Sequence, residues 1–326
     1  MELKITRSID LTKKQWHSYT RSFNTVFSKN FAIEYFIHKY LKNIDGTSYH
    51  TLLFENNEVV GGCTVIPNNY LFGSEKIKTG LVVDVFILPA HRSDPYALLR
   101  MYKALKERLR EENIAMIIAV PNEMVYPYWK NIVKWKDIGT IPYYAYPVRL
   151  ANVLRTSNKL LNSSSLSLAK INIGINSVMS MFWNPTQKRF PISLDRSDPV
   201  VEAQRYTSDH VVIKNDLHSF AYRIVDENKV QTAYLIDFYN QENLSKDLRT
   251  LLLAVKYILK NHQIDLLIFV GKLHFFQTIL IKIPFNKEPK HLYLTGDLIN
   301  TAKISSQTET YNCKNWDFGL FNYDVR

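Results

Sequence analysis

Residues 80–120, GLVVDVFILPAHRSDPYALLRMYKALKERLREENIAMIIAV, contain the pattern that decides the fold. Two apolar runs, 80–88 and 115–120, hold a single charged residue, Asp84, and are typical of strands buried on both faces. Between them, the spacing of apolar residues up to about residue 112 predicts an amphipathic helix. Strand, helix and strand with short connections form a right-handed unit, so we expect the two strands to be parallel.

The preceding residues predict further elements of the same domain. The aromatic spacing in residues 11–40 favours helix, and 43–46 reads as a turn. Residues 49–55 and 59–67 predict two strands of a hairpin, joined by an Asn-Asn turn. We therefore expect a mixed sheet with a central βαβ unit, flanked by helices.

The second half of the chain repeats this order. Residues 236–239 (IDFY) match 83–86 (VDVF), and an apolar helix and the strand-like residues 263–268 follow at similar offsets. The sequence therefore predicts an α/β (α+β) fold of two tandem domains, 1–154 and 196–326. A linker with a connecting helix, apolar over 168–183 and expected to pack between the domains, would occupy 155–195.

The composition indicates the cellular compartment of the protein and the classes of partner that it can bind. Two cysteines are too few for a disulfide framework, and no apolar run reaches the ~20 residues that a membrane span needs. The N-terminus has no secretory signal pattern, so we expect a cytoplasmic protein with no membrane span. The net charge of +11 favours anionic ligands, but the basic residues are scattered among acids, so we expect no stable nucleic-acid partner.

The sequence lacks the motifs that several other kinds of catalytic or binding site require. No His or Cys pair has the spacing of a zinc site, so we expect no metal, and there is no Gly-x-Ser-x-Gly nucleophile elbow. The sequence contains no Gly-x-Gly arrangement, so neither a dinucleotide-binding loop nor a Walker loop is present. Cys63 lies within a predicted strand, where a buried thiol is the usual outcome.

The loop after residue 88 is the segment best suited to a phosphate. At the start of a helix, backbone N–H groups lack intrahelical partners and carry partial positive charge. Arg92 adds a guanidinium, and Pro95 suits the first helical turn. The alternative is a helix capped by its own Ser93 or Asp94, with no ligand.

The order of helix, hairpin, buried strand, Arg-containing loop, helix and strand resembles the GNAT superfamily of acyl-CoA-dependent acyltransferases over residues 1–150. That family's loop reads Arg/Gln-x-x-Gly-x-Gly/Ala and wraps the CoA pyrophosphate. Here Arg92 matches the first position and Ala97 the last, while Pro95 replaces the middle glycine. The resemblance implies acetyl-CoA (acyl-CoA) as co-substrate, with the loop residues Arg92, Ser93, Asp94, Pro95, Tyr96 and Ala97 at the phosphates.

The resemblance also implies how the thioester arm would lie. The strands 80–88 and 115–120 would diverge near Leu88 and Val120, and pantetheine amides would bond the main chain of Phe86, Ile87 and Leu88. Asp84 could accept the proton of an amine nucleophile, directly or through water. The alternative for Asp84 is a buried acid that only hydrogen-bonds the neighbouring backbone.

The general acid of such a transferase is often a tyrosine that follows an asparagine. Residues 121–129 supply Asn122, which we place at the cofactor, and two candidate acids, Tyr128 first and Tyr126 second. Trp129 stands where many family members have that tyrosine, and these aromatics could equally pack in the core.

The resemblance favours an N-acetyltransferase that acts on an amine of a small molecule, sugar or cell-envelope precursor. The second domain, whose loop 240–246 lacks the arginine, would be degenerate for CoA and shape the acceptor cleft. Two alternatives stay open: a Fem-like aminoacyltransferase that uses aminoacyl-tRNA, and a non-catalytic binding module that keeps the fold.

Overall fold

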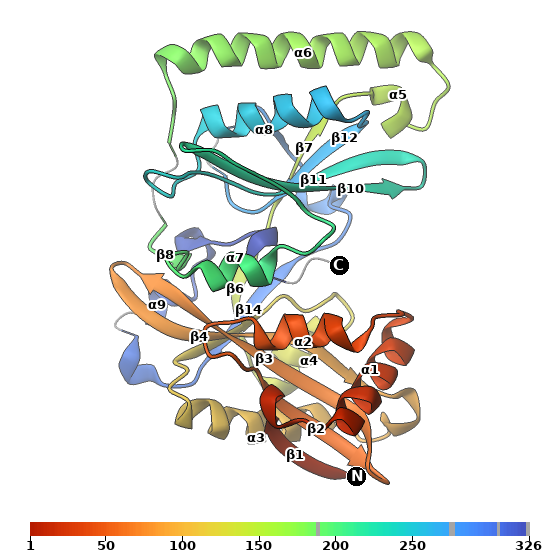
Figure 1. The fold of residues 1–326 in the computed structure, drawn as a ribbon, viewed down its shortest axis with the longest axis vertical. Helices are drawn as coiled ribbons and strands as arrows, with labels where there is room; N and C mark the ends of the chain where they lie inside the picture. Colours follow the sequence, from red (N-terminus) through yellow and green to blue (C-terminus); the bar gives the residue numbers. More distant parts are fainter. Residues whose placement is uncertain (187–189, 274–277, 305–306, 324–326) are drawn as a thin grey trace. The chain divides into compact units, whose positions relative to one another are not determined.

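The computed structural model describes residues 1–186, 190–273, 278–304 and 307–323. The chain forms two compact units, shown in Figure 1. The first unit consists of Met1–Thr140, Pro191–Arg205 and Leu292–Trp316. The second unit consists of Ile141–Phe190, Tyr206–His291 and Asp317–Arg326. Each unit is built around its own mixed sheet.

The sheet of the first unit has the strand order β1-β2-β3-β4-β5-β14-β6, with β8 paired to β3 and to the short β15. Its strands are β1 (Glu2–Arg7), β2 (Tyr49–Glu55), β3 (Glu58–Phe72), β4 (Glu75–Ile87), β5 (Met116–Ala119), β6 (Lys136–Thr140), β8 (Ile192–Leu194), β14 (Tyr293–Leu298) and β15 (Trp316–Asp317). β4 and β5 pair in parallel, which confirms the predicted βαβ unit.

Helices cover both faces of this sheet. They are α1 (Lys13–Phe27), α2 (Ile33–Leu41), α3 (Ala97–Glu111), α4 (Tyr126–Tyr128), α7 (Pro199–Arg205) and α9 (Gln307–Thr310). Phe86 of β4 packs against Tyr19 and Phe23 of α1, whereas its neighbours Val85 and Ile87 pack with the apolar side of α3. Because successive strand residues point to opposite faces, α1 and α3 cover opposite faces of the sheet.

The second sheet has the order β13-β7-β12-β11-β10-β9. Its strands are β7 (Tyr143–Pro147), β9 (Val211–Lys214), β10 (His218–Glu227), β11 (Val230–Asn240), β12 (Leu266–Val270) and β13 (Ile281–Lys282). The helices of this unit are α5 (Leu150–Val153), α6 (Lys159–Phe182) and α8 (Leu248–Asn261). α8 packs on the sheet, and α6 lies outside α8 (Figure 1).

The two units share the elements that the sequence repeat predicts. In each, a hairpin with two left-handed residues at its turn leads into a long strand, at Asn56 and Asn57 in the first unit and at Asn228 and Lys229 in the second. In the first unit, α3 then connects the next strand, β4, to its parallel partner β5, and in the second unit α8 connects β11 to its parallel partner β12. The predicted fold class, two GNAT-like α/β units, is confirmed.

The chain divides between the units differently from a simple tandem. β7 directly follows β6 in the sequence, yet it pairs with β12 in the second sheet. β14 comes from near the C-terminus, yet it inserts between β5 and β6 in the first sheet. The first sheet therefore takes β14, and also the short β8 and β15, from the second half of the chain, and the second sheet takes β7 from the first half. A division at residues 154 and 196 does not include this exchange.

Two helices also differ from the sequence-based expectation. Residues 11–40 form two helices, α1 and α2, because Ser28 ends the first one in a left-handed conformation. α6 begins at Lys159, within the stretch expected as linker, because the side chain of Asn158 accepts the backbone N–H of Leu161 and caps it. The predicted helix over 168–183 is the second part of α6.

Candidate functional site

The strands β4 and β5 separate at their carboxyl ends. Their parallel ladder consists of three pairs and ends with Leu81 opposite Ile118. β5 stops at Ala119, but β4 continues to Ile87 with only β3 as its described partner. Beyond Leu81, no described strand pairs with the edge of β4 that faces β5. This opening, called the wedge below, agrees with the divergence that the resemblance implies and begins earlier along both strands.

A β-bulge bends β4 at the wedge. Gly62 of β3 lies opposite Phe86 and Thr64 lies opposite Val83, so Asp84 and Val85 together face one residue of β3. Asp84 has a φ of 52°, a left-handed conformation that aspartate tolerates better than most residues. Gly62 is needed here, because a Cβ atom at that position would lie 2.9 Å from the ring of Phe86.

Asp84 is buried among side chains of α2. The Tyr40 hydroxyl donates a hydrogen bond to the Asp84 carboxylate, and the Lys39 Nζ lies 2.6 Å from its Oδ2. The side chain of Asp84 is 0% exposed and that of Lys39 is 9% exposed. A buried carboxylate is stable only when it is paired and hydrogen-bonded, and α2 supplies both partners.

A chain of polar side chains continues from Tyr40 through the core of the first unit. The hydroxyls of Tyr40 and Tyr19 lie 2.7 Å apart, and Tyr19 reaches the Thr64 hydroxyl at 3.3 Å. His50 contacts Thr64 through Nδ1 at 2.9 Å and Ser8 through Nε2 at 2.6 Å. Complete burial lowers the pKa of His50 to about 3, so its imidazole is neutral at physiological pH.

The loop between β4 and α3 stands at the end of the wedge. The N-cap residue of α3, Tyr96, makes no side-chain capping hydrogen bond. Asp94 instead accepts the backbone N–H of Tyr96 at 2.8 Å, which lowers the pKa of Asp94, and pairs with Arg100. The Nε of Arg92 donates to the Ile87 carbonyl at 2.8 Å, so its guanidinium folds back onto the end of β4.

Tyr128 of α4 reaches the first turn of α3. Its hydroxyl donates to the carbonyl of Pro95. Burial raises the pKa of Tyr128, while a hydrogen bond from the backbone N–H of Leu99 lowers it. The structure thus brings Tyr128 to the loop that the resemblance assigns to pyrophosphate.

The other residues expected around Tyr128 have different surroundings. Tyr126 donates to Asp137 at 2.9 Å and stacks on Tyr293, with ring centroids 3.9 Å apart. The Oδ1 of Asn122 accepts the backbone N–H of Val125 at 3.0 Å and so shapes the turn before α4. Trp129 is buried against the α3 side of the sheet, where it packs with Tyr102 and Trp135.

Some main-chain groups of residues 86–88 already have hydrogen-bonding or strand partners within the protein. Phe86 and Ile87 pair with Gly62 and Gly61 of β3 on one edge. The backbone N–H of Leu88 donates to Val60, and the Ile87 carbonyl accepts from Arg92. Groups on the opposite edge of β4 remain for a ligand in the wedge.

Sequence reasoning missed the two α2 residues that contact Asp84. Lys39 and Tyr40 lie 45 and 44 positions before Asp84, so no local pattern links them. The one available signal was chemical: a lone acid in an apolar strand needs a cationic or hydroxyl partner. The helix α2 contributes both from adjacent positions.

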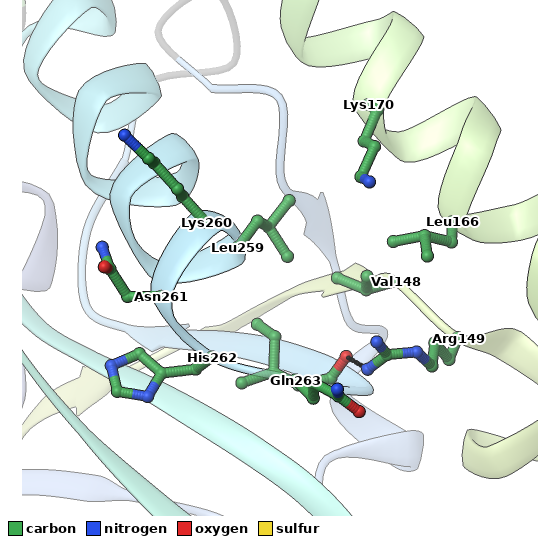
Figure 2. Close-up of a pocket in the computed structure, with 10 residues that line it drawn as sticks. Val148, Arg149, Leu166, Lys170, Leu259, Lys260, Asn261, His262 and Gln263 are labelled. Atoms are coloured by element: carbon green, nitrogen blue, oxygen red, sulfur yellow. Dashed lines mark hydrogen bonds between the residues drawn. The ribbon is translucent and has the colours of Figure 1, made fainter.

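A cavity of about 270 Å³ lies in the second unit, between α6 and the end of α8 (Figure 2). Its lining includes Arg149, Lys170, Lys260 and His262, and Arg149 donates to the carbonyl of Ile264 at 2.7 Å. None of these residues belongs to the wedge. Among the residues that the structure describes, no group of three or more His, Cys, Asp or Glu side chains could hold a metal ion.

Both cysteines are free thiols, and no helix in the described part of the chain is long and apolar enough to cross a membrane. Cys63 is buried, as its position in a strand predicts, and burial raises the pKa of its thiol to about 12.

The strand order of the first unit, its open β4 edge and the helix start beside it define a GNAT-like fold. The family model of the acetyltransferase (GNAT) domain matches residues 7–130. The match lies within the first unit, and it confirms the resemblance of these residues to this superfamily. No curated protein matches the chain by sequence.

Solved structures resemble the whole chain. A GCN5-related N-acetyltransferase from Anabaena variabilis ATCC 29413 aligns with a TM-score of 0.58 and 13% identity, over 93% of this chain and 74% of that one. A probable N-acyltransferase from Enterococcus faecalis V583 gives a TM-score of 0.57 at 10% identity, with 93% and 74% covered. Saccharomyces cerevisiae N-myristoyltransferase, solved with myristoyl-CoA, gives 0.52 at 13% identity, with 91% and 80% covered. At these identities the likeness concerns the fold.

Proposed function

We propose that the first unit binds acetyl-CoA and transfers the acetyl group to an amine. The observation that carries this proposal is the wedge: β4 extends from Val82 to Ile87 beyond its last pair with β5, and it ends beside a helix start. An extended chain with amides can add to such an edge as a further strand does. Pantetheine has two amides in an extended chain and fits this requirement.

The start of α3 suits the phosphates of the same ligand. The backbone N–H groups of a helix's first turn attract anions. At the α3 start, Asp94 accepts the N–H of Tyr96 and Tyr128 that of Leu99, and the N-cap residue Tyr96 adds no side-chain acceptor of its own. Arg92 precedes α3 in the same loop and can exchange its contact with the Ile87 carbonyl for a phosphate. The loop from Arg92 to Ala97 would therefore hold the pyrophosphate, with Asn122 fixing the adjacent turn.

In the transfer, the amine nitrogen forms a bond to the acetyl carbon, and the carbon–sulfur bond breaks. The nitrogen loses a proton and the leaving thiolate gains one, so the reaction needs an acceptor and a donor. We propose that Asp84 is the acceptor. Its carboxylate is buried, so the proton would pass through the Tyr40 hydroxyl, which donates to Asp84.

We propose Tyr128, in preference to Tyr126, as the donor of the proton that the thiolate gains. The raised pKa of Tyr128 keeps its hydroxyl protonated at neutral pH, as a donor must be. Tyr126 also has a raised pKa, but Asp137 and Lys130 hold its hydroxyl. The acceptor amine we propose belongs to a small molecule, a sugar or a cell-envelope precursor, and the two free thiols support the cytoplasm as the compartment.

The experiment measures the steady-state rate of acetyl transfer to a panel of amines, with Tyr40→Phe and Tyr128→Phe as variants. If each residue moves a proton, each variant lowers kcat by about 100-fold or more and leaves the KM for acetyl-CoA within about threefold. Tyr126→Phe is the matched control and retains most of the rate. An unchanged kcat for Tyr40→Phe would mean that Asp84 only holds the bulge in place.

A further inference from the structure

α6 carries an exposed apolar face along its whole length. Eight apolar side chains on α6 are between 51% and 88% exposed, namely Leu160, Leu168, Ile171, Ile175, Val178, Met179, Met181 and Phe182. At about 100° per residue, all of them except Met181 fall within an arc of about 100° on the helix. Ala169, Ile173 and Ser180 are buried and lie on the opposite side, where the helix packs on its own unit.

The exposed apolar face of α6 is long compared with the apolar patches on most folded proteins. A helix of 24 residues is about 36 Å long, and the apolar arc runs from its first turn to its last. Trp183, which follows directly, is 55% exposed as well. Contiguous apolar surfaces of this extent on a folded protein mark sites of interaction.

The charges around this face have one sign. Between Asp137 and Asp195 the described residues include no Asp or Glu, but they include the four basic residues Arg149, Arg155, Lys159 and Lys170. α8, which lies under α6, also has no acidic residue and carries Arg249, Lys256 and Lys260. On α6 itself the charged residues are Lys159 and Lys170, both exposed and both outside the apolar arc.

The cavity beside α6 is also lined by basic side chains. α6 contributes Leu166 and Lys170 to its lining, and the opposite wall contributes Arg149 and Lys260 (Figure 2). The ten residues that line it include no Asp or Glu. Arg149 is already paired with Asp265, at 3.8 Å, so an anionic group next to α6 would meet the ammonium groups of Lys170 and Lys260.

We propose that the α6 face docks on an anionic lipid surface. An interfacial helix of this kind lies in the plane of the bilayer, with its apolar face among the headgroups and upper acyl chains and its basic side chains at the phosphates. Phe182 and Trp183 provide aromatic rings at the end of the helix, as is common at a membrane interface. The inference does not depend on acyl-CoA binding.

Charge also decides against a second copy of the chain as the occupant. The α6 faces themselves are apolar, and two of them packed together would leave Lys159 and Lys170 of both copies without an acidic partner on either helix. An anionic lipid surface neutralises the same cations. The apolar arc and the basic surroundings are therefore both satisfied by lipid.

The test is co-sedimentation of the full chain with vesicles at low salt. We expect the partition coefficient for vesicles of phosphatidylcholine with phosphatidylglycerol to be at least about tenfold higher than for phosphatidylcholine alone. Raising the salt concentration should reduce this difference. Equal partition into both vesicle types, or none, would overturn the proposal.

A matched pair of variants separates the α6 face from net charge. Ile175→Asp changes the centre of the face, and Ile281→Asp makes the same change at a 63% exposed isoleucine on β13 of the same unit. We expect Ile175→Asp to reduce partition by at least about tenfold and Ile281→Asp by less than about twofold. Equal effects contradict the proposal. So does a dimer that Ile175→Asp dissociates in the absence of vesicle binding.

Discussion

The helix that follows the long central strand begins differently in the two units. In the first unit, the N-cap residue of α3, Tyr96, makes no side-chain cap. In the second, the carboxylate of Asp247 accepts the backbone N–H of Thr250 at 2.6 Å and caps α8. Asn184 accepts the next free amide, that of Arg249. A carboxylate lies at both helix starts, but Asp247 accepts an amide within α8, whereas Asp94 accepts the amide of Tyr96, which precedes α3.

The strands show the same contrast. β11 and β12 pair from Thr232 to Leu235, and β11 continues to Asn240, so the second unit also has diverging strands. There, however, Gly319 bridges to Gly271 after the end of β12, and the helical turn Leu320–Asn322 packs on β11. The chain's own C-terminal segment thus covers the strand ends. We therefore expect the two units, which share one fold, to differ in ligand binding, because different groups occupy the helix start and the strand edge.

The largest effect that we expect comes from the buried pair at the bulge, which shapes the wedge of the first unit. Asp84→Asn leaves Lys39 without its carboxylate and should lower the free energy of unfolding by about 3–5 kcal/mol. Denaturant melts measure this value. The double variant Asp84→Asn with Lys39→Met should recover part of the loss. If the two single losses simply add, the pair does not interact as the structure indicates.

The second prediction converts the α3 start into a copy of the α8 start. Tyr96→Asp places a carboxylate where α8 has Asp247, and it should weaken acetyl-CoA binding by about 20-fold or more because the new anion repels phosphate and occupies the amides. Tyr96→Asn is the control, since asparagine caps as well without charge. Calorimetric titration that shows equal affinity for both variants would contradict a phosphate seat at this helix.

The pH dependence of stability tests the polar chain of the first unit. The folded pKa of His50, about 3, is below the value of about 6.5 for an unfolded chain, so the unfolded state binds more protons between these pH values. Stability should therefore fall by up to about 1.4 kcal/mol per pH unit as the pH drops from 6.5 toward 3. His50→Gln should flatten this slope, as measured by denaturant melts across the range. An unchanged slope would exclude His50 as its source.

The smallest effect concerns the cap of the second unit. Asp247→Ala should cost about 1 kcal/mol of stability, because the amide of Thr250 loses its acceptor. It should create no second site for acetyl-CoA, since the segment at Gly319 still covers the strand ends. Thermal melts and titration measure the two outcomes. A gain of CoA binding would show that the cap alone distinguishes the units.

The sequence was sufficient for the local features of the fold. The apolar runs at 80–88 and 115–120 predicted the parallel strands, and the paired Asn residues predicted the hairpin turn. The exchange of β7 and β14 was not predictable, because each strand has a pattern that either sheet could bury. The start of α6 was missed because its Ser-rich first turns resemble a loop, whereas Ser165 accepts the backbone N–H of Leu150.

The candidate site was predictable only where its parts are neighbours in sequence. The loop from Arg92 to Ala97 follows β4 directly, so its place at the wedge could be inferred from order alone. The pairing of Asp84 with Lys39 depends on how α2 packs over the sheet, and the contact of Tyr128 with Pro95 depends on how α4 meets α3. Both are tertiary contacts between segments more than thirty residues apart.

The stoichiometry of acetyl-CoA binding is the most direct test of the difference between the units. Isothermal titration of the full chain should give one site per chain, and Tyr96→Asp should remove it. Two sites per chain, no site in a folded protein, or a single site that Tyr96→Asp leaves intact would contradict the account.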